Sequence, residues 1–333
     1  MSMPLIPDQY RGTTGKNNFP IMIQLGLLTL VLLGVFGALW IQNPTTQIAS
    51  LDDQYTTVPM HSASTAIGLE ALDDVSLRAK AAYVWDVKGE RALYKKNETE
   101  SLPLASITKL MTALVVHELF PDNQVVTIPV AAIRQEGNSG LQAGENLTIA
   151  ELTEFSLLAS SNDAAYTLAA SVGTALGERD PTQQFVSGMN IRAQELGLHS
   201  LDFKNMTGLD ESRTVPGGVG TARDVSFLME YIVENYPEIL DSTRESGARI
   251  YSDDGVFHDL ANTNPITNQI PNLIGSKTGY TDLAGGNLTI AFDLGNNRPI
   301  IITVLGSTRD ARFSDVMTLV DAVQTAVKTE SYE

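Results

Sequence analysis

The chain contains no cysteine. This absence excludes disulfide bonds, a thiolate nucleophile, zinc held by cysteines and iron–sulfur clusters. It does not fix the compartment, because an oxidising space permits disulfides without requiring them.

Basic residues are scarce as well. The 333 residues include 22 Lys and Arg against 39 Asp and Glu, which gives a net charge of −17. A nucleic-acid partner is therefore not expected, since such proteins need a basic face to displace counterions. Hydrophobic residues make up 43% of the chain and charged residues 18%. That composition supports a packed core and excludes wholesale disorder.

Histidine is rare and scattered. The chain has four histidines, at His61, His117, His199 and His258, with no His-x-x-x-His or His-x-His pair. A zinc peptidase is therefore not supported, and we expect neither a metal nor another cofactor. No histidine accompanies a Gly-x-Ser-x-Gly motif, so a Ser-His-Asp hydrolase is not supported either.

A long apolar run stands near the N-terminus. Ile21–Ile41 contains one Gln and no charge, and as a helix it would measure about 30 Å, one bilayer core. Arg11 and Lys16 precede the run, and the next basic residue is Arg78. The positive-inside rule then places the N-terminus in the cytoplasm and exports the rest. A buried core helix is the weaker alternative, because such helices rarely lack charge over this length.

No small-x-small cleavage site follows the run, so we expect a retained anchor rather than a cleaved signal peptide. Trp40, at the outer end, suits the membrane interface. The chain then divides into residues 1–20 as a cytoplasmic N-terminus, 21–41 as the transmembrane anchor, 42–75 as a Thr-, Ser- and Asp-rich linker, and 76–333 as the folded domain.

Within that domain, strands are predicted at both ends and helices between them. Such terminal strands can pair in one antiparallel sheet with a central helical lobe packed on its face, an α/β (α+β) fold. The predicted strands are Ala81–Val87, Arg91–Tyr94, Asn287–Leu294 and Pro299–Leu305. The predicted helices are Ser106–Leu119, 148–159 behind a Thr148–Glu151 capping box, Asp163–Val172 ended by Gly173, one from Asp180-Pro181 to Gly197, one from Thr221 to before Pro237, and Ala311–Lys328.

A serine can instead be activated by a lysine. Ser106-Ile107-Thr108-Lys109 places the two side chains one helical turn apart on one face. The serine lies at the helix N-terminus, where the dipole favours negative charge. The lysine must be neutral to accept a proton, and burial beside a second cation would lower its pKa and permit that.

Three short motifs each occur once and in a fixed order. They are Ser106-x-x-Lys109, Ser160-Ser161-Asn162 and Lys277-Thr278-Gly279. A Lys-Thr-Gly is expected only roughly 0.06 times by chance in this composition, whereas the other two are individually common. This set resembles the one that penicillin-binding proteins and class A β-lactamases share.

The surrounding segments extend the resemblance. PLASITKLMTALV, LLASSNDAAYTLA, FKNMTGLD, TARDVSFLMEYI and GSKTGYTDLAGGNL resemble segments of the low-molecular-mass penicillin-binding proteins. These are the D-alanyl-D-alanine carboxypeptidases of the S11 peptidase type, whose fold is β-lactamase/transpeptidase-like. The similarity spans about residues 78–328.

The resemblance implies a catalytic role for three residues. Ser106 would be the acylated nucleophile and Lys109 its general base, while Ser160 would relay a proton to the leaving amine. Asn162 would hold the substrate amide or orient Lys109. The implied oxyanion hole consists of the backbone N–H groups of Ser106 and Tyr280, which fits the physics of fixed donors.

The resemblance also implies the substrate-binding residues. Lys277 would supply positive charge beside Ser160, and Thr278 would bind the terminal carboxylate. Gly279 and Tyr280 are also implied to be substrate-binding residues. Arg312, in DARFSDVMTL, resembles an arginine that helps to bind the carboxylate. A solvated arginine at a helix start is the rival interpretation.

The implied activity is removal of the terminal D-Ala from peptidoglycan stem pentapeptides through an acyl-enzyme. β-Lactams would be covalent inhibitors, and the domain would work outside the cell membrane. After Gly279 the chain has room for a hairpin and a helix, so we expect no separate β-rich domain. Family members without that domain include DD-endopeptidases, which cut peptidoglycan cross-links, and this alternative stays open.

Two further alternatives are weaker. A class A β-lactamase needs a Glu-x-x-Leu-Asn segment, which the chain lacks, and its Ser-x-Asn motif here has Ser161 in the middle. A β-lactam or muropeptide sensor that is acylated without turnover would normally carry a cytoplasmic signalling domain, for which about 20 residues before the anchor leave no room.

Overall fold

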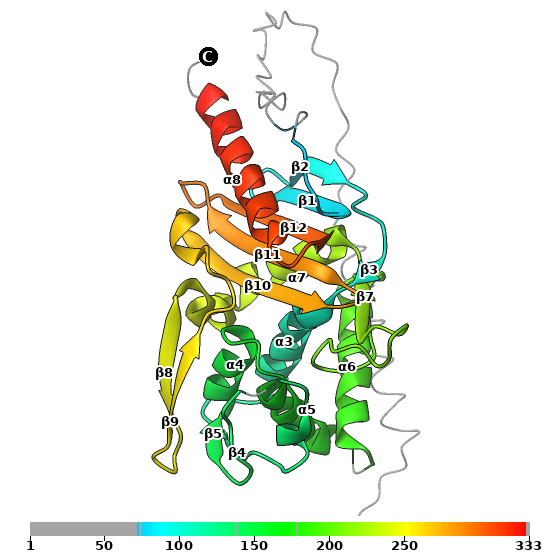
Figure 1. The fold of residues 1–333 in the computed structure, drawn as a ribbon, viewed down its shortest axis with the longest axis vertical. Coiled ribbons are helices and arrows are strands. Elements are labelled where there is room, and N and C mark those ends of the chain that lie inside the picture. Colours follow the sequence, from blue (N-terminus) through cyan, green and yellow to red (C-terminus); the bar gives the residue numbers. More distant parts are fainter. Residues whose placement is uncertain (1–71, 73–74, 138, 178, 331–333) are drawn as a thin grey trace, which may run out of the picture. The chain divides into compact units, whose positions relative to one another are not determined.

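The computed structural model describes residue 72 and residues 75–137, 139–177 and 179–330 (Figure 1). They belong to one compact unit within Ser64–Glu333. The predicted anchor Ile21–Ile41 and the segment before it lie outside the described residues. In the described part, no helix combines the length and apolar character needed to cross a bilayer. Leu72 and Val75, at the end of the predicted linker, pack against the core of the folded unit.

A five-stranded antiparallel sheet joins the two ends of the domain. Its order is β10-β11-β12-β1-β2, and every neighbouring pair is antiparallel. The strands are β1 (Ala81–Asp86), β2 (Arg91–Lys96), β10 (Leu273–Thr281), β11 (Gly285–Asp293) and β12 (Pro299–Ser307). The predicted sheet of terminal strands is thus confirmed, with β10 added at one edge.

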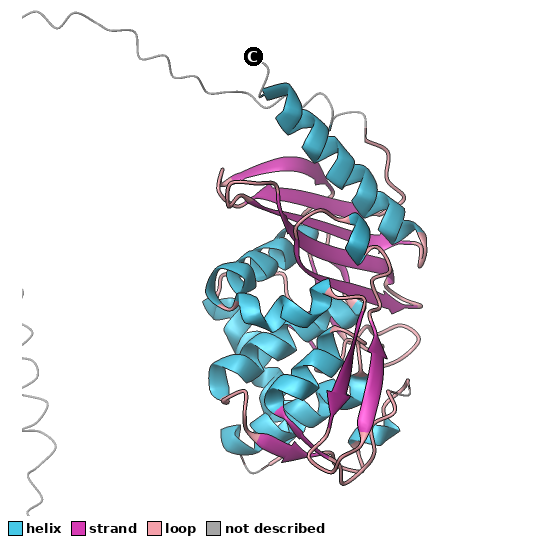
Figure 2. Cartoon of the chain, turned by 90° about the vertical axis from the view of Figure 1, so that its left-hand side faces the viewer, coloured by secondary structure: helices cyan, strands magenta, loops and turns pink. Residues whose placement is uncertain are grey.

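Helices cover both faces of this sheet (Figures 1 and 2). Tyr83 and Ile301 face a core shared with α7 (Ala222–Asn235) and the other central helices. Ile302, on the opposite face, joins a second core built on α8 (Ala311–Glu330). Burial on both faces explains why β12 reads as an almost continuous apolar run rather than an alternating one.

The central helices form the predicted lobe between β3 (Leu102–Pro103) and β10. They are a 3₁₀ turn η1 (Ala105–Thr108), α3 (Lys109–Leu119), α4 (Ile149–Leu157), α5 (Asn162–Leu176) and α6 (Pro181–Glu195). The helix starts were well marked in the sequence. Thr148 and Glu151 form the predicted capping box, while the side chains of Asp180 and Thr221 cap α6 and α7 by accepting bonds from Gln183 and Asp224 backbone N–H groups.

Shorter elements complete the unit, and the sequence did not predict them. Their pairing depends on distant partners, because strands of two to five residues carry little pattern of their own. The strands are β3 (Leu102–Pro103), β4 (Val125–Thr127), β5 (Asn146–Thr148), β6 (Asp202–Phe203), β7 (Gly218–Gly220), β8 (Gly247–Tyr251) and β9 (Phe257–Ala261). The 3₁₀ helices are η2 (Ala132–Arg134), η3 (Pro237–Arg244) and η4 (Thr267–Gln269).

The helix end predicted at Gly173 was wrong. Gly173 was expected to end its helix, but α5 continues to Leu176. A Cβ at Gly173 would lie 1.9 Å from the carbonyl oxygen of Pro181. The glycine therefore serves the close approach of α5 to the first turn of α6 rather than a helix C-terminus.

Gly173→Ala should lower the free energy of unfolding by about 1–3 kcal/mol, because backbone must shift to admit the methyl group. Gly188, inside α6, is the matched control, since its Cβ would make an ordinary contact 3.6 Å from Leu176. Gly188→Ala should stabilise the protein by about 0.5–1 kcal/mol. Urea unfolding midpoints of the two variants test this, and an unchanged midpoint for Gly173→Ala would contradict it.

Candidate active site

Ser106 lies on the 3₁₀ turn η1, directly before α3, rather than in the first turn of an α-helix as predicted. Ala105 precedes it with a φ of +49°, a left-handed conformation that costs energy for any residue but glycine. Gly208 packs against this turn so closely that a Cβ there would lie 1.9 Å from the Ala105 carbonyl oxygen. The strained turn is thus held from outside by the loop that carries Gly208.

Lys109 is fully buried and has three hydrogen-bond partners. Its Nζ lies 2.9 Å from Ser106 Oγ, 2.7 Å from Asn162 Oδ1 and 2.7 Å from the carbonyl oxygen of Thr207. The predicted pairing of Ser106 and Lys109 on one face is confirmed. Thr207 belongs to the FKNMTGLD segment, but no role for it was predicted.

The surroundings of Lys109 favour its neutral form. Burial lowers the pKa of Lys109 well below its usual range, and the positive charge of Lys277 lowers it further. These are the two causes that the sequence predicted for an activated lysine. An uncharged amine 2.9 Å from a hydroxyl can take its proton.

Asn162, the first residue of α5, has its amide engaged on both sides. Oδ1 faces Lys109, and Nδ2 donates to the carbonyl oxygen of Glu136 at 2.6 Å. Of the two roles implied for Asn162, this geometry suits the orientation of Lys109. Glu136 enters the site through its backbone, which sequence motifs do not reveal.

Ser160 and Lys277 form a second hydroxyl–amine pair. Lys277 Nζ lies 2.9 Å from Ser160 Oγ and donates to the Thr278 carbonyl oxygen at 3.1 Å. Ser160 adopts a φ of +59°, a second strained backbone position. Burial and then the charge of Arg312 lower the pKa of Lys277 to about 7.

The strand β10 brings the Lys-Thr-Gly motif against η1. A Cβ at Gly279 would lie 2.8 Å from the Leu104 carbonyl oxygen and 3.3 Å from the Ala105 Cβ. Only a residue without a side chain permits this approach, which sets Tyr280 beyond the turn of Ser106. The proposed oxyanion role of the Ser106 and Tyr280 N–H groups stays a prediction.

Thr278 donates a hydrogen bond from its hydroxyl to Thr263 Oγ1 at 2.7 Å. Thr263 follows β9, and no motif pointed to it. Ser160 and Thr263, from two other segments of the chain, thus hydrogen-bond to the side chains of Lys277 and Thr278, respectively.

Arg312, at the start of α8, is buried rather than solvated. It is 7% exposed, and its Nη1 donates to the Gly279 carbonyl oxygen at 2.7 Å. Burial and the neighbouring Arg309 lower the pKa of Arg312 to about 10. The rival interpretation of Arg312 as a solvated surface residue is wrong, and its charge lies directly behind the Lys-Thr-Gly strand.

Comparison with known proteins agrees with this geometry. The family model of the S11 peptidases, described as D-alanyl-D-alanine carboxypeptidase, matches residues 68–309. The chain is 31% identical over 256 residues to the D-alanyl-D-alanine carboxypeptidase DacF of Bacillus subtilis, covering 74% of this chain and 62% of DacF. It is 32% identical over 235 residues to DacB2 of Mycobacterium tuberculosis, covering 70% and 76%. The chain thus spans less than two thirds of DacF.

Two further comparisons bear on activity. The chain is 30% identical over 234 residues to a D-alanyl-D-alanine endopeptidase of Pseudomonas aeruginosa, covering 69% of this chain and 71% of that protein. It also resembles the structure of penicillin-binding protein D2 from Listeria monocytogenes in the ampicillin-bound form. The TM-score is 0.62 at 28% identity, covering 75% of this chain and 98% of that one.

Lys277→Met should raise the pKa of Lys109, because the substitution removes a positive charge that disfavours the protonated amine. NMR titration of the lysine side-chain signals measures this. Lys204, which is exposed, supplies the control variant Lys204→Met, which should leave the Lys109 titration in place. A Lys109 pKa that falls or stays unchanged in Lys277→Met would contradict the coupling of the two amines.

Proposed function

Because the chain belongs to the D-alanyl-D-alanine carboxypeptidase family of S11 peptidases, we propose that it removes the terminal D-Ala from peptidoglycan stem pentapeptides. The reaction runs through an acyl-enzyme on Ser106. The observation that carries this proposal is the buried Lys109, whose pKa is lowered and whose amine lies 2.9 Å from Ser106 Oγ.

The three partners of Lys109 define what its amine can do. The oxygens of Asn162 and Thr207 can only accept hydrogen bonds. A neutral amine has two N–H donors, so these two oxygens use both. Its lone pair is then left for the hydroxyl of Ser106, which donates its proton along the third contact. The arrangement suits a general base, because Ser106 is the one partner among the three from which the Lys109 amine can accept a proton.

Acylation begins when Ser106 Oγ attacks the carbonyl carbon of the penultimate D-Ala and passes its proton to Lys109. Negative charge develops on the carbonyl oxygen, where the N–H groups of Ser106 and Tyr280 are proposed to donate. Collapse of this intermediate breaks the C–N bond, and the proton taken up by Lys109 passes through Ser160 to the leaving amine of the terminal D-Ala. Water then attacks the ester, Lys109 accepts its proton, and Ser106 regains a proton as it leaves.

The free carboxylate of the substrate is assigned to the Lys-Thr-Gly strand. The Thr278 hydroxyl can turn from Thr263 to that carboxylate, while Lys277 and Arg312 supply positive charge nearby. Arg312 is already hydrogen-bonded to the Gly279 carbonyl oxygen. Its contribution to carboxylate binding is therefore a fixed positive potential, and its side chain does not need to move onto the substrate. Charge-assisted bonds of this kind are stronger than neutral ones.

Cleavage of peptidoglycan cross-links is the second candidate, favoured by the similarity to the P. aeruginosa endopeptidase. In a cross-link the same D-Ala carbonyl is joined to a D-centre that also carries a carboxylate. The pentapeptide and the cross-linked peptide would therefore react at the same catalytic residues. The ratio of rates on free pentapeptide and on cross-linked dimer decides between them, and we expect the pentapeptide to react faster.

Penicillin should acylate Ser106, and Lys109→Ala should lower the acylation rate by roughly 10²–10⁴, the contribution of a general base. Peptide mapping locates the adduct, and Ser106→Ala is the control that should take no label. Released D-Ala from a pentapeptide measures turnover. An adduct on another serine would remove Ser106 from the role, and acylation without any D-Ala release would mark a sensor rather than an enzyme.

We also propose that Ile21–Ile41 is a retained anchor that holds the domain outside the cell membrane. The uncharged run and the basic residues before it support this. The mature protein should stay in the membrane fraction, start near Met1, and lose its domain to externally added protease. A mature N-terminus between residues 42 and 60 would instead mean a cleaved signal peptide.

A further inference from the structure

The FKNMTGLD segment lies against the catalytic lysine, although none of its side chains has a part in the proposed reaction. Its contact with the lysine is made by backbone, since the Thr207 carbonyl oxygen accepts a hydrogen bond from Lys109 Nζ at 2.7 Å. This oxygen belongs to the peptide group that joins Thr207 to Gly208. The direction of that peptide group therefore decides whether Lys109 keeps this partner.

The side chain of Asn205 holds the opposite end of the same peptide group. In a trans peptide the C=O and N–H bonds point in opposite directions. The Gly208 N–H donates to Asn205 Oδ1 at 2.7 Å, while the Thr207 C=O on the other side accepts from Lys109. One planar group is thus bound at both ends, by an amide side chain and by the Lys109 amine.

Asn205 organises the rest of this turn as well. Its Oδ1 accepts two further hydrogen bonds, from the Thr207 N–H at 3.1 Å and from Thr207 Oγ1 at 3.0 Å. Such bonds to the residues that follow form an Asx turn. Its Nδ2 donates to the Leu209 carbonyl oxygen at 2.9 Å and to the Glu211 carboxylate. Because one side of the amide only accepts and the other only donates, the orientation of Asn205 is fixed.

Gly208 cannot hold the peptide group by itself. Its φ is +79°, and a Cβ there would lie 1.9 Å from the Ala105 carbonyl oxygen. The position therefore requires glycine, a residue that adopts positive and negative φ about equally readily. The close packing against the turn of Ser106 thus leaves the backbone without local stiffness, and the hydrogen bonds to Asn205 supply the missing constraint.

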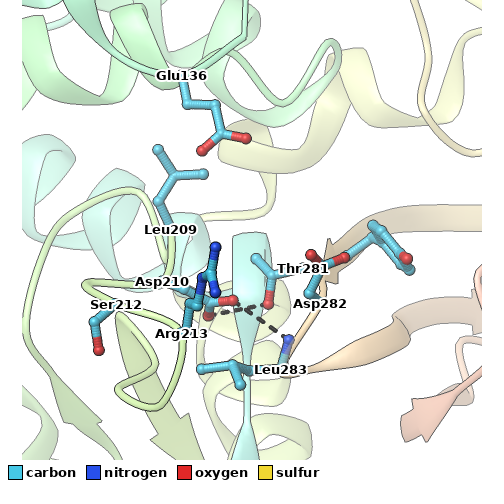
Figure 3. A pocket seen from close by; sticks show the side chains of 9 residues that line it. Glu136, Leu209, Asp210, Ser212, Arg213, Thr281, Asp282 and Leu283 are labelled. Atoms are coloured by element: carbon cyan, nitrogen blue, oxygen red, sulfur yellow. Dashed lines mark hydrogen bonds between the residues drawn. The ribbon is translucent and has the colours of Figure 1, made fainter.

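The loop is fastened at a separate point beyond this turn. Asp210 lines a cavity that lies beyond Tyr280 (Figure 3). There it accepts hydrogen bonds from Thr281 Oγ1 at 3.1 Å and from the Leu283 N–H at 3.3 Å. These bonds fix the loop against the end of β10, but they act two residues after the peptide group that Asn205 holds.

We propose that Asn205 is a positioning residue for the general base. Its bond to the Gly208 N–H keeps the Thr207 carbonyl oxygen on one N–H of the Lys109 amine. The lone pair of that amine then stays directed at Ser106. The inference rests on the proposed function, because it takes Lys109 as the base. Without the Asn205 side chain the peptide group can turn, and the amine is no longer confined to one direction.

The variant Asn205→Ala tests this in the full-length protein. The limiting rate constant for acylation of Ser106 by penicillin should fall about 10- to 100-fold, the loss expected when a reacting group is displaced. The penicillin concentration that gives half of this rate should not change, because Asn205 acts through Lys109. NMR titration should show a lower pKa for Lys109, since its ammonium form loses a hydrogen-bond acceptor.

Asn190, on α6, supplies the matched control. Its amide binds backbone just before the same loop, with Nδ2 donating to the Phe203 carbonyl oxygen and Oδ1 accepting from the Phe203 N–H, each at 2.8 Å. Asn190→Ala and Asn205→Ala both lose hydrogen bonds to backbone, so both should unfold at a lower temperature than the wild type. At a temperature where both stay folded, Asn190→Ala should keep the wild-type acylation rate and Lys109 titration.

The double variant Asn205→Asp with Glu211→Gln retains the turn. The carboxylate keeps an oxygen for the Gly208 N–H, and the bond between the two substituted side chains is kept with donor and acceptor exchanged. Acylation should therefore recover at high pH. The negative charge now lies one peptide group from Lys109 and raises its pKa. Because the base must be neutral, the midpoint of the pH–rate profile should move to higher pH than in the wild type.

Three results would overturn the inference while leaving the proposed function in place, provided that Lys109→Ala acylates slowly. They are wild-type acylation by Asn205→Ala, an equal loss of rate in Asn190→Ala, and a double variant whose pH–rate midpoint does not move. Normal acylation by Lys109→Ala would overturn both the inference and the role of Lys109 in the proposed function.

Discussion

An uncharged lysine in the interior is the constraint on which this active site depends. Burying a charged amine without a counter-ion costs several kcal/mol, so the protein does better to release the proton. Lys109 hydrogen-bonds to Ser106, Asn162 and the Thr207 carbonyl, and the described part of the chain places no carboxylate among its hydrogen-bond partners. A carboxylate at this place would have stabilised the ammonium and removed the base.

Positive charge is concentrated behind this lysine although the chain as a whole carries a net charge of −17. Lys277 lowers the pKa of Lys109, and Arg312 lowers that of Lys277. These cations lie on β10 and α8, on or against a sheet that is packed on both faces. That rigid support keeps mutually repelling groups together, and an anionic substrate terminus would relieve part of the repulsion.

Much of this arrangement could be predicted because the signals are local or are carried by reactive side chains. Capping residues such as Thr148 and Asp180 satisfy N–H groups three residues away, so they mark helix starts without help from the rest of the fold. The side chains of Ser106 and Lys109, three residues apart, likewise come together within one turn without help from the rest of the fold. The helix end predicted at Gly173 was wrong because a glycine is typical both of a helix end and of a close contact between helices. Only the position of Pro181 distinguishes these two roles.

The sequence by itself determined the strands at the two ends, the capped helices between them, and the side chains that bear the chemistry. The tertiary structure decided which backbone groups complete the site. The carbonyl oxygen of Thr207 holds Lys109, and that of Glu136 holds Asn162. Every residue has a backbone carbonyl, so the residue type does not predict this role. The cavity beyond Tyr280 was hidden for the same reason, since its walls come from segments about 70 residues apart whose approach depends on packing of the whole domain.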